Sequence, residues 1–237
     1  AKVNCFDQVP SNETVVVDIV AVTHATEQAV QTQTVTIIDN EALPTVTLSV
    51  GSPTIGEDQG IRNTTVTATL NTPAGRDVTV TLTTSGPAIH DTDYTLNGTI
   101  LIPEGKTTAS ITLSSMTDVL DEDDETLTID ITNVVNGEEL ATQTQTVTIM
   151  DDDATPTVDM AVAATTINES IPGNATTLTV SLSAVAGRNV TVTLGKSGLA
   201  TAPDYTLVDT ILIEPLTQSV TVTLTAKGDV LDEFDED

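Results

Sequence analysis

The residues whose chemistry stands out in this sequence are six acids within eight positions, from Asp118 to Glu125. They immediately precede the alternating run 126–132, which is typical of a β-strand. Carboxylates this close together repel one another and raise each other's pKa. Such a loop is tolerable if it is fully solvated, or if a hard cation such as Ca²⁺ lies among the carboxylates.

Few residues elsewhere in the chain are of the types that usually act in catalysis. The two histidines, His24 and His90, have no repeated counterpart, and no glycine-rich phosphate loop is present. We therefore predict that the protein is not an enzyme. A single cysteine, Cys5, excludes a disulfide within the chain. Zinc and copper sites are disfavoured because His90 is the only soft ligand near the acids.

The net charge and the hydropathy of the chain limit the classes of partner and the cellular locations that we expect. The formal net charge is -28, which disfavours nucleic acid and anionic membranes as partners. No apolar run is long enough to span a bilayer, so we expect no membrane insertion in this segment. An acidic sequence without a long apolar run is expected of a secreted protein whose leader has been removed, or of a piece of a longer protein. We expect an extracellular or cell-surface location.

An internal repeat organises the chain. Residues 31–37 are identical to residues 143–149, and 13–18 match 125–130, at a shift of 112 positions. The repeat predicts three parts: 1–41 are the last two strands of one domain, 42–153 a complete domain, and 154–237 a domain lacking its last two strands. Either the sequence is a window on a longer array, or the hairpin at 13–38 completes the open domain of a neighbouring chain.

Period-two alternation predicts that the complete domain is built from strands alone. Val78, Val80 and Leu82 are expected to point inward, and the threonines between them outward. We predict an all-β fold of tandem seven-stranded antiparallel immunoglobulin-like β-sandwiches. The expected strands are 45–50, 64–70, 77–83, 94–102, 107–113, 125–132 and 142–149.

The expected topology brings the acids together. Successive antiparallel strands place every second loop at the same end of a sandwich. Thirteen of the eighteen acids in 42–153 fall on one such set of loops. They lie at 57–58, 91–93, 118–125 and 151–153, and the last group leads into the next repeat. Ca²⁺ suits carboxylates from several loops better than Mg²⁺, which keeps its waters and demands tighter geometry.

Four motifs together resemble the Calx-β domain family, whose members regulate sodium–calcium exchangers or form repeats in surface proteins. They are Ile55–Gly60, Asp91–Tyr94, Asp118–Glu125 and Val147–Asp153. The resemblance implies bound Ca²⁺ held by acidic residues of both repeats. The implied ligands are Glu57, Asp91, Asp93, Asp118, Asp121, Glu122, Asp123, Asp151, Asp152 and Asp153, with Glu169, Asp204, Asp229, Asp232 and Asp235 in the third part. Ser85 stands where metal-binding members often carry an acid, and Phe234 replaces Asp123 in the third part.

These observations favour a structural role in cell adhesion: a tandem repeat of an extracellular stalk, adhesin or fibre, stiffened by Ca²⁺ at the junctions between domains. Its expected partners are neighbouring domains or identical subunits end to end, with a cell-surface or matrix ligand as a further candidate. Two alternatives stay open. One is a self-assembling filament subunit completed by strand exchange, and the other is a calcium-sensing regulatory module.

Overall fold

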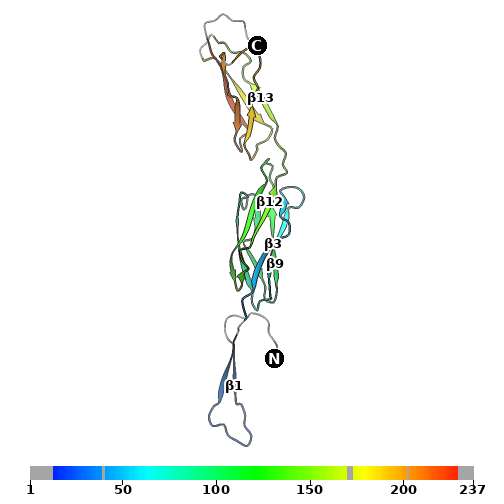
Figure 1. Ribbon diagram of the computed structural model, residues 1–237, viewed down its shortest axis with the longest axis vertical. Coiled ribbons are helices and arrows are strands. Elements are labelled where there is room, and N and C mark those ends of the chain that lie inside the picture. Colours follow the sequence, from blue (N-terminus) through cyan, green and yellow to red (C-terminus); the bar gives the residue numbers. More distant parts are fainter. Residues whose placement is uncertain (1–12, 39–40, 170–172, 202, 229–237) are drawn as a thin grey trace. The chain divides into compact units, whose positions relative to one another are not determined.

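The computed structural model describes residues 13–38, 41–169, 173–201 and 203–228. Every regular element in these ranges is a β-strand, which confirms the predicted all-β class. No helix in the described part of the chain is long and apolar enough to cross a membrane. The residues form two compact units (Figure 1). The first holds those up to Gly56, Gly60–Met116 and Glu125–Ile149, and the second holds Glu57–Gln59, Thr117–Asp124 and those from Met150 onward.

Two facing sheets of the first unit form a sandwich. One sheet has the order β4-β12-β10-β6-β8 and the other β11-β3-β5-β9-β7. The strands of the first sheet are β4 (Thr54–Gly56), β12 (Thr144–Met150), β10 (Glu125–Val135), β6 (Val78–Ser85) and β8 (Thr99–Ile102). Those of the second are β11 (Glu138–Glu139), β3 (Thr45–Val50), β5 (Asn63–Leu70), β9 (Thr108–Ser115) and β7 (Tyr94–Leu96).

One hydrophobic core, aliphatic except for Tyr94, joins the two sheets. Val78, Val80 and Leu82 are buried as predicted, and the threonines between them are not. Leu127 and Ile129 of β10 are fully buried against the same core. Burial of one such side chain stabilises the fold by about 1.5–3 kcal/mol. Period-two alternation therefore identified the inward face correctly.

The predicted single strand at 94–102 is wrong, because the structure divides it into two strands in different sheets. β7 pairs with β9, whereas β8 pairs with β6. The change of sheet takes place at Asn97-Gly98, where Leu82 N donates to Gly98 O at 2.8 Å. Tyr94, Leu96, Ile100 and Ile102 are all buried, so the alternation continues across the crossing and does not reveal it.

The first unit also contains a separate hairpin of β1 (Glu13–Asp18) and β2 (Thr32–Ile37). The second unit has a four-stranded sheet of order β13-β14-β18-β16 and a two-stranded sheet β15-β17. Its strands are β13 (Val158–Val162), β14 (Ala175–Leu182), β15 (Val190–Thr193), β16 (Tyr205–Thr206), β17 (Thr210–Ile213) and β18 (Ser219–Ala226). A smaller core with fully buried Val180 and Ile213 lies between these strands.

Hydrogen bonds at the ends of β4, β9 and β12 show that these ends share one pole of the sandwich. Ser115 Oγ, at the end of β9, donates to Gly56 O at 2.8 Å. Thr148 N donates to Pro53 O at 2.9 Å, and Glu57 N donates to Met150 O at 3.0 Å. From the first of these last two hydrogen bonds to the second, the residue number increases on both strands. β4 and β12 therefore run in the same direction. The loops that follow all three strands are therefore neighbours.

Gly86, which directly follows β6, provides a test of this packing. Its φ is +130°, and an added Cβ would collide with the carbonyl oxygen of Thr126. Gly60 also has a positive φ, +75°, but an added Cβ would meet nothing within 4 Å. We expect Gly86→Ala to lower the free energy of unfolding by at least about 2 kcal/mol more than Gly60→Ala, measured by denaturant titration. Equal losses would contradict the close approach of Gly86 to β10.

Candidate metal centre

Three carboxylates converge in the second unit. Glu57, Asp151 and Asp153 each offer one oxygen, and these oxygens lie within 4.8 Å of one another. Glu57 follows β4, and the two aspartates follow β12, whose end is bonded to Glu57 N. Because β4 and β12 run side by side in the same direction, the residues that follow the two strands lie close together.

Asp118 and Asp152 hold the backbone around this cluster. Asp118 N donates to Glu57 Oε1 at 3.2 Å, and Leu120 N donates to Asp118 Oδ1 at 2.7 Å. Asp152 accepts from Asp58 N at 3.2 Å and from Gln59 N at 2.8 Å. The three loops are therefore tied together through carboxylate–amide bonds. Both carboxylate oxygens of Asp152 thus accept hydrogen bonds from the loop after β4.

Two of the carboxylate oxygens in the cluster are buried without a hydrogen-bond donor in the described part of the chain. Asp151 Oδ1 and Asp153 Oδ2 are buried and accept no hydrogen bond from the described residues. Burial, reinforced by the charges of Asp118, Asp153 and Asp151, raises the pKa of Glu57 to about 7. Burial also raises the pKa of Asp151 and of Asp153. A buried anionic group without compensation is costly, so this site favours a proton or a cation.

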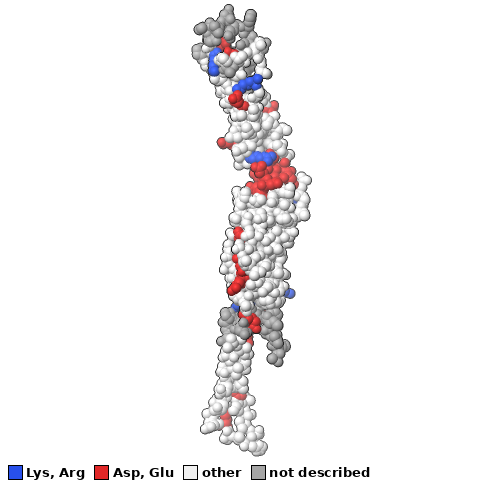
Figure 2. Space-filling model, viewed as in Figure 1, with Lys and Arg blue, Asp and Glu red and all other residues white. Residues whose placement is uncertain are grey.

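A second part of the acidic loop binds an arginine. Arg188 Nη2 and Nε donate to the two oxygens of Asp121 at 2.6 and 3.2 Å, and Nη1 donates to Asp123 Oδ1 at 2.8 Å. The Asp121 side chain is only 4% exposed. Gly187 N donates to Asp121 O at 3.1 Å, and a Cβ on Gly187 would collide with the Glu122 side chain. Figure 2 shows a dense patch of acidic atoms with basic atoms beside it.

The remaining acids predicted as ligands in the complete repeat make local bonds. Asp91 is 76% exposed and lies 3.1 Å from His90 Nδ1. Asp93 Oδ2 accepts from Ile89 N, and the Asp93 carbonyl accepts from Met116 N at 2.8 Å. Neither residue belongs to the group formed by Glu57, Asp151 and Asp153.

Only two of the acids predicted as ligands in the third repeat are described. Asp204 accepts hydrogen bonds from Thr201 N and Oγ1, and the backbone bond in particular lowers the pKa of Asp204. Glu169 is exposed. Asp229, Asp232 and Asp235 lie outside the described residues. The third-repeat site therefore stays a prediction.

Arg188 is the site residue that sequence reasoning missed. A signal was present, since Ala186-Gly-Arg188 repeats Ala74-Gly-Arg76. Nothing in one repeat, however, says that the arginine will meet an acid 67 positions earlier in the chain.

No family model and no curated protein matches the chain. Solved structures similar to it include an apo-form Calx CBD1 domain, 22% identical over 47% of this chain and 100% of that one, with a TM-score of 0.41. Another is the calcium binding domain CBD12 of CALX1.1, 23% identical over 75% of this chain and 73% of that one, at 0.38. A two-domain protein of unknown function from Bacteroides fragilis is 9% identical over 78% of this chain and 88% of that one, at 0.36.

The raised pKa of Glu57 predicts how stability without metal depends on pH. Between pH 4.5 and about 7, folded Glu57 holds a proton that the unfolded chain has released. Because the folded state binds more protons there, stability falls as pH rises, by at most about 3 kcal/mol from this group. We expect the free energy of unfolding in EDTA to fall more between about pH 5 and pH 8 in the wild type than in Glu57→Gln. Parallel pH profiles would contradict this assignment.

A double-mutant cycle tests the Arg188–Asp121 pair. Removing one partner leaves a buried charge uncompensated, whereas removing both does not. We expect Arg188→Gln and Asp121→Asn to show a coupling energy of about 1–3 kcal/mol in thermal unfolding. The matched control is Lys196–Asp209, a 2.6 Å pair whose aspartate is 85% exposed. That pair should couple by less than about 0.5 kcal/mol. Similar coupling in both pairs would show that burial at Asp121 adds nothing.

Proposed function

We propose that the cluster of Glu57, Asp151 and Asp153, with Asp118 beside it, binds Ca²⁺, and that the chain is a calcium-stiffened repeat of an extracellular stalk, adhesin or fibre. The observation that carries this proposal is the convergence of three carboxylates around buried oxygens that accept no hydrogen bond. A divalent cation would compensate the charge that the fold concentrates there. No proton donor in the described residues does so for Asp151 Oδ1 and Asp153 Oδ2.

The chemistry of the donors favours Ca²⁺ among common cations. All of the converging ligands are carboxylate oxygens on loops, and hard cations prefer oxygen. Ca²⁺ accepts six to eight such ligands in flexible geometry, so backbone carbonyls and waters can complete its shell. Mg²⁺ demands a tighter octahedron and keeps its waters. Zinc prefers histidine and cysteine, which the cluster lacks.

A calcium ion here would act mechanically. Glu57 follows β4, Asp118 follows β9, and Asp151 and Asp153 lie on the segment that continues into the next repeat. An ion held by all of them would tie that segment to the loops at the end of the sandwich. Without the ion, repulsion between the carboxylates would favour separation of the same loops. An array of such repeats would be flexible in chelator and stiff in calcium.

The proposed location follows from the affinity expected of such a site. Extracellular calcium modules bind with Kd values of about 10⁻⁴–10⁻³ M, which suits the millimolar calcium outside cells. The net charge of -28 agrees with a surface exposed to such ions. The proposed partners are neighbouring domains or identical subunits end to end.

Calcium titration tests the proposal directly. At roughly 2 mM Ca²⁺ and a Kd of about 0.1 mM, binding adds about 1.8 kcal/mol of stability, which corresponds to a rise in Tm of roughly 5–10 °C over EDTA. We expect Glu57→Gln and Asp153→Asn each to abolish most of this rise. Isothermal titration calorimetry would give the Kd and the number of ions.

Asp159→Asn is the matched control, because it removes one exposed negative charge from β13, outside the cluster. This variant should keep the full calcium response. An unchanged Tm of the wild-type protein on addition of calcium would contradict the proposal and indicate that the acids are simply solvated. A midpoint near 10⁻⁷–10⁻⁵ M would instead identify a calcium-sensing regulatory module.

A further inference from the structure

Arg188, in the second unit, lies in a position that is built from oxygen atoms of the same unit. Its guanidinium donates to both carboxylate oxygens of Asp121 and to Asp123 Oδ1, and Nη1 also donates to the backbone carbonyl of Glu122 at 3.3 Å. Thr155 Oγ1 donates to Asp121 Oδ1 at 3.4 Å. Carboxylate and carbonyl oxygens are also the ligands that Ca²⁺ prefers. The arginine therefore occupies a place in which a hard cation would find suitable ligands.

The backbone on the N-terminal side of Arg188 is fixed against the acidic loop. Ala186 is only 1% exposed, its carbonyl accepts from Leu216 N at 2.9 Å, and it forms an isolated β-bridge with Asp121. Gly187 N donates to Asp121 O at 3.1 Å, and the lack of a side chain at Gly187 leaves room for Glu122. These contacts do not involve the guanidinium. They place it beside Asp121 without the help of an ion.

The acids that bind Arg188 are distinct from the candidate calcium site but close to it. Neither Asp121 nor Asp123 belongs to the three-carboxylate cluster found among the described residues. Burial raises the pKa of Asp151, the charge of Asp121 adds to this rise, and Arg188 opposes it. The two groups of acids therefore interact electrostatically, although they face different partners.

We propose that Arg188 is a built-in cation that occupies a second cation position, at Asp121 and Asp123, and thereby restricts Ca²⁺ to the cluster of Glu57, Asp151 and Asp153. The restriction presupposes the calcium site proposed above. A guanidinium is always charged, and its planar fork engages both oxygens of Asp121 at once. These oxygens are turned toward the arginine, and a divalent cation placed among them would be repelled by the guanidinium charge.

The charges at this position determine what removal of the arginine would do. Asp121 and Asp123 carry one negative charge each, and Arg188 compensates one of the two. The Asp121 side chain is 4% exposed, so solvent compensates its charge poorly. A buried carboxylate without a partner is costly, and in Arg188→Gln a further Ca²⁺ would remove that cost. The wild type therefore binds one ion fewer than the same fold without the arginine.

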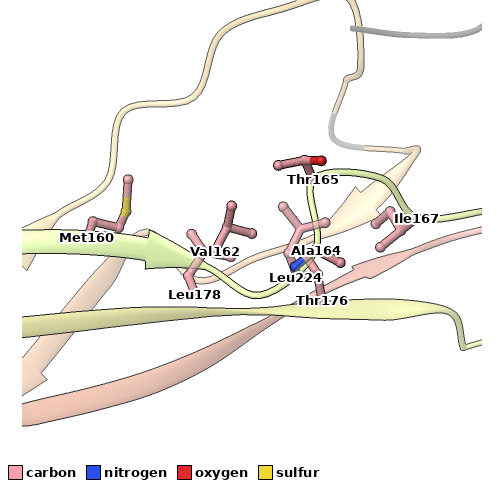
Figure 3. A pocket seen from close by; sticks show the side chains of 8 residues that line it. All are labelled: Met160, Val162, Ala164, Thr165, Ile167, Thr176, Leu178 and Leu224. Atoms are coloured by element: carbon pink, nitrogen blue, oxygen red, sulfur yellow. Dashed lines mark hydrogen bonds between the residues drawn. The ribbon is translucent and has the colours of Figure 1, made fainter.

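An apolar cavity in the second unit is not an alternative site for the further ion. It has a volume of about 380 Å³ and is lined by residues of β13, β14, β18 and the segment after β13. Figure 3 shows Met160, Val162, Leu178 and Leu224 around it. None of the lining residues is charged. An ion gained on removal of Arg188 would therefore report on the acidic loop.

Equilibrium dialysis of the 237-residue chain at saturating Ca²⁺ tests the role of Arg188 by counting bound ions. We expect Arg188→Gln to bind one ion more than the wild type. The matched control is Lys196→Gln, which removes the same charge from a pair whose aspartate, Asp209, is 85% exposed. This control should bind as many ions as the wild type, because solvent compensates an exposed carboxylate.

Two further variants separate the charge of the arginine from the carboxylate that it covers. Arg188→Lys keeps the charge, and Asp121→Asn/Arg188→Gln removes the buried carboxylate together with the arginine, so both should bind as many ions as the wild type. The calcium-dependent rise in Tm should be larger in Arg188→Gln than in the wild type, because the further ion replaces the lost partner of Asp121.

Equal ion counts in Arg188→Gln and the wild type would overturn the proposed role of Arg188, as would an additional ion in any of the three control variants. An Arg188→Gln protein that stays unfolded at saturating Ca²⁺ would also overturn it, because the ion would then not replace the arginine. A wild type that binds no Ca²⁺ would refute the proposed calcium function instead. A gain of one ion in Arg188→Gln would still support the role of the arginine in that case.

Discussion

The repulsion between carboxylates at the end of the complete sandwich is the constraint on which the rest of this structure depends. β4 and β12 run side by side and end at the same level, so the residues that follow them, Glu57, Asp151 and Asp153, lie close together. Burial penalises the charged form of each carboxylate, and neighbouring negative charges add to this penalty, so all three have raised pKa values. A fold that gathers charge in this way needs a compensating partner at the same place.

The structure divides that compensation between two kinds of partner. Arg188 pairs with Asp121 and Asp123 through charge-assisted bonds to three carboxylate oxygens. Backbone amides at 58 and 59 satisfy Asp152. Asp151 Oδ1 and Asp153 Oδ2, with Glu57 beside them, are buried and accept no hydrogen bond from the described residues. The arginine thus leaves uncompensated the three carboxylates at which we propose a bound ion.

A second physical requirement, the covering of apolar strands, shapes the rest of the molecule. One pair of strands occurs twice, as β10–β12 inside a core and as β1–β2 without one. The second unit also leaves apolar side chains uncovered among the described residues, since Met160 and Val158 of β13 are exposed. Exposed aliphatic side chains favour burial, which the complete sandwich provides for the equivalent residues.

The sequence by itself determined most of the strands of the complete repeat, the inward face and the repeat, because alternation with period two and identity at a shift of 112 can be read directly from the chain. It did not predict the short strands β4 and β11. It also indicated that acids from distant loops would meet. Only the tertiary structure decided which acids do so. Asp91 points to solvent and Asp121 to Arg188, whereas Glu57 meets Asp151 and Asp153. The same limit hid the crossing between sheets at Asn97-Gly98. Loop paths and long-range partners are set by packing between segments, which no local pattern encodes.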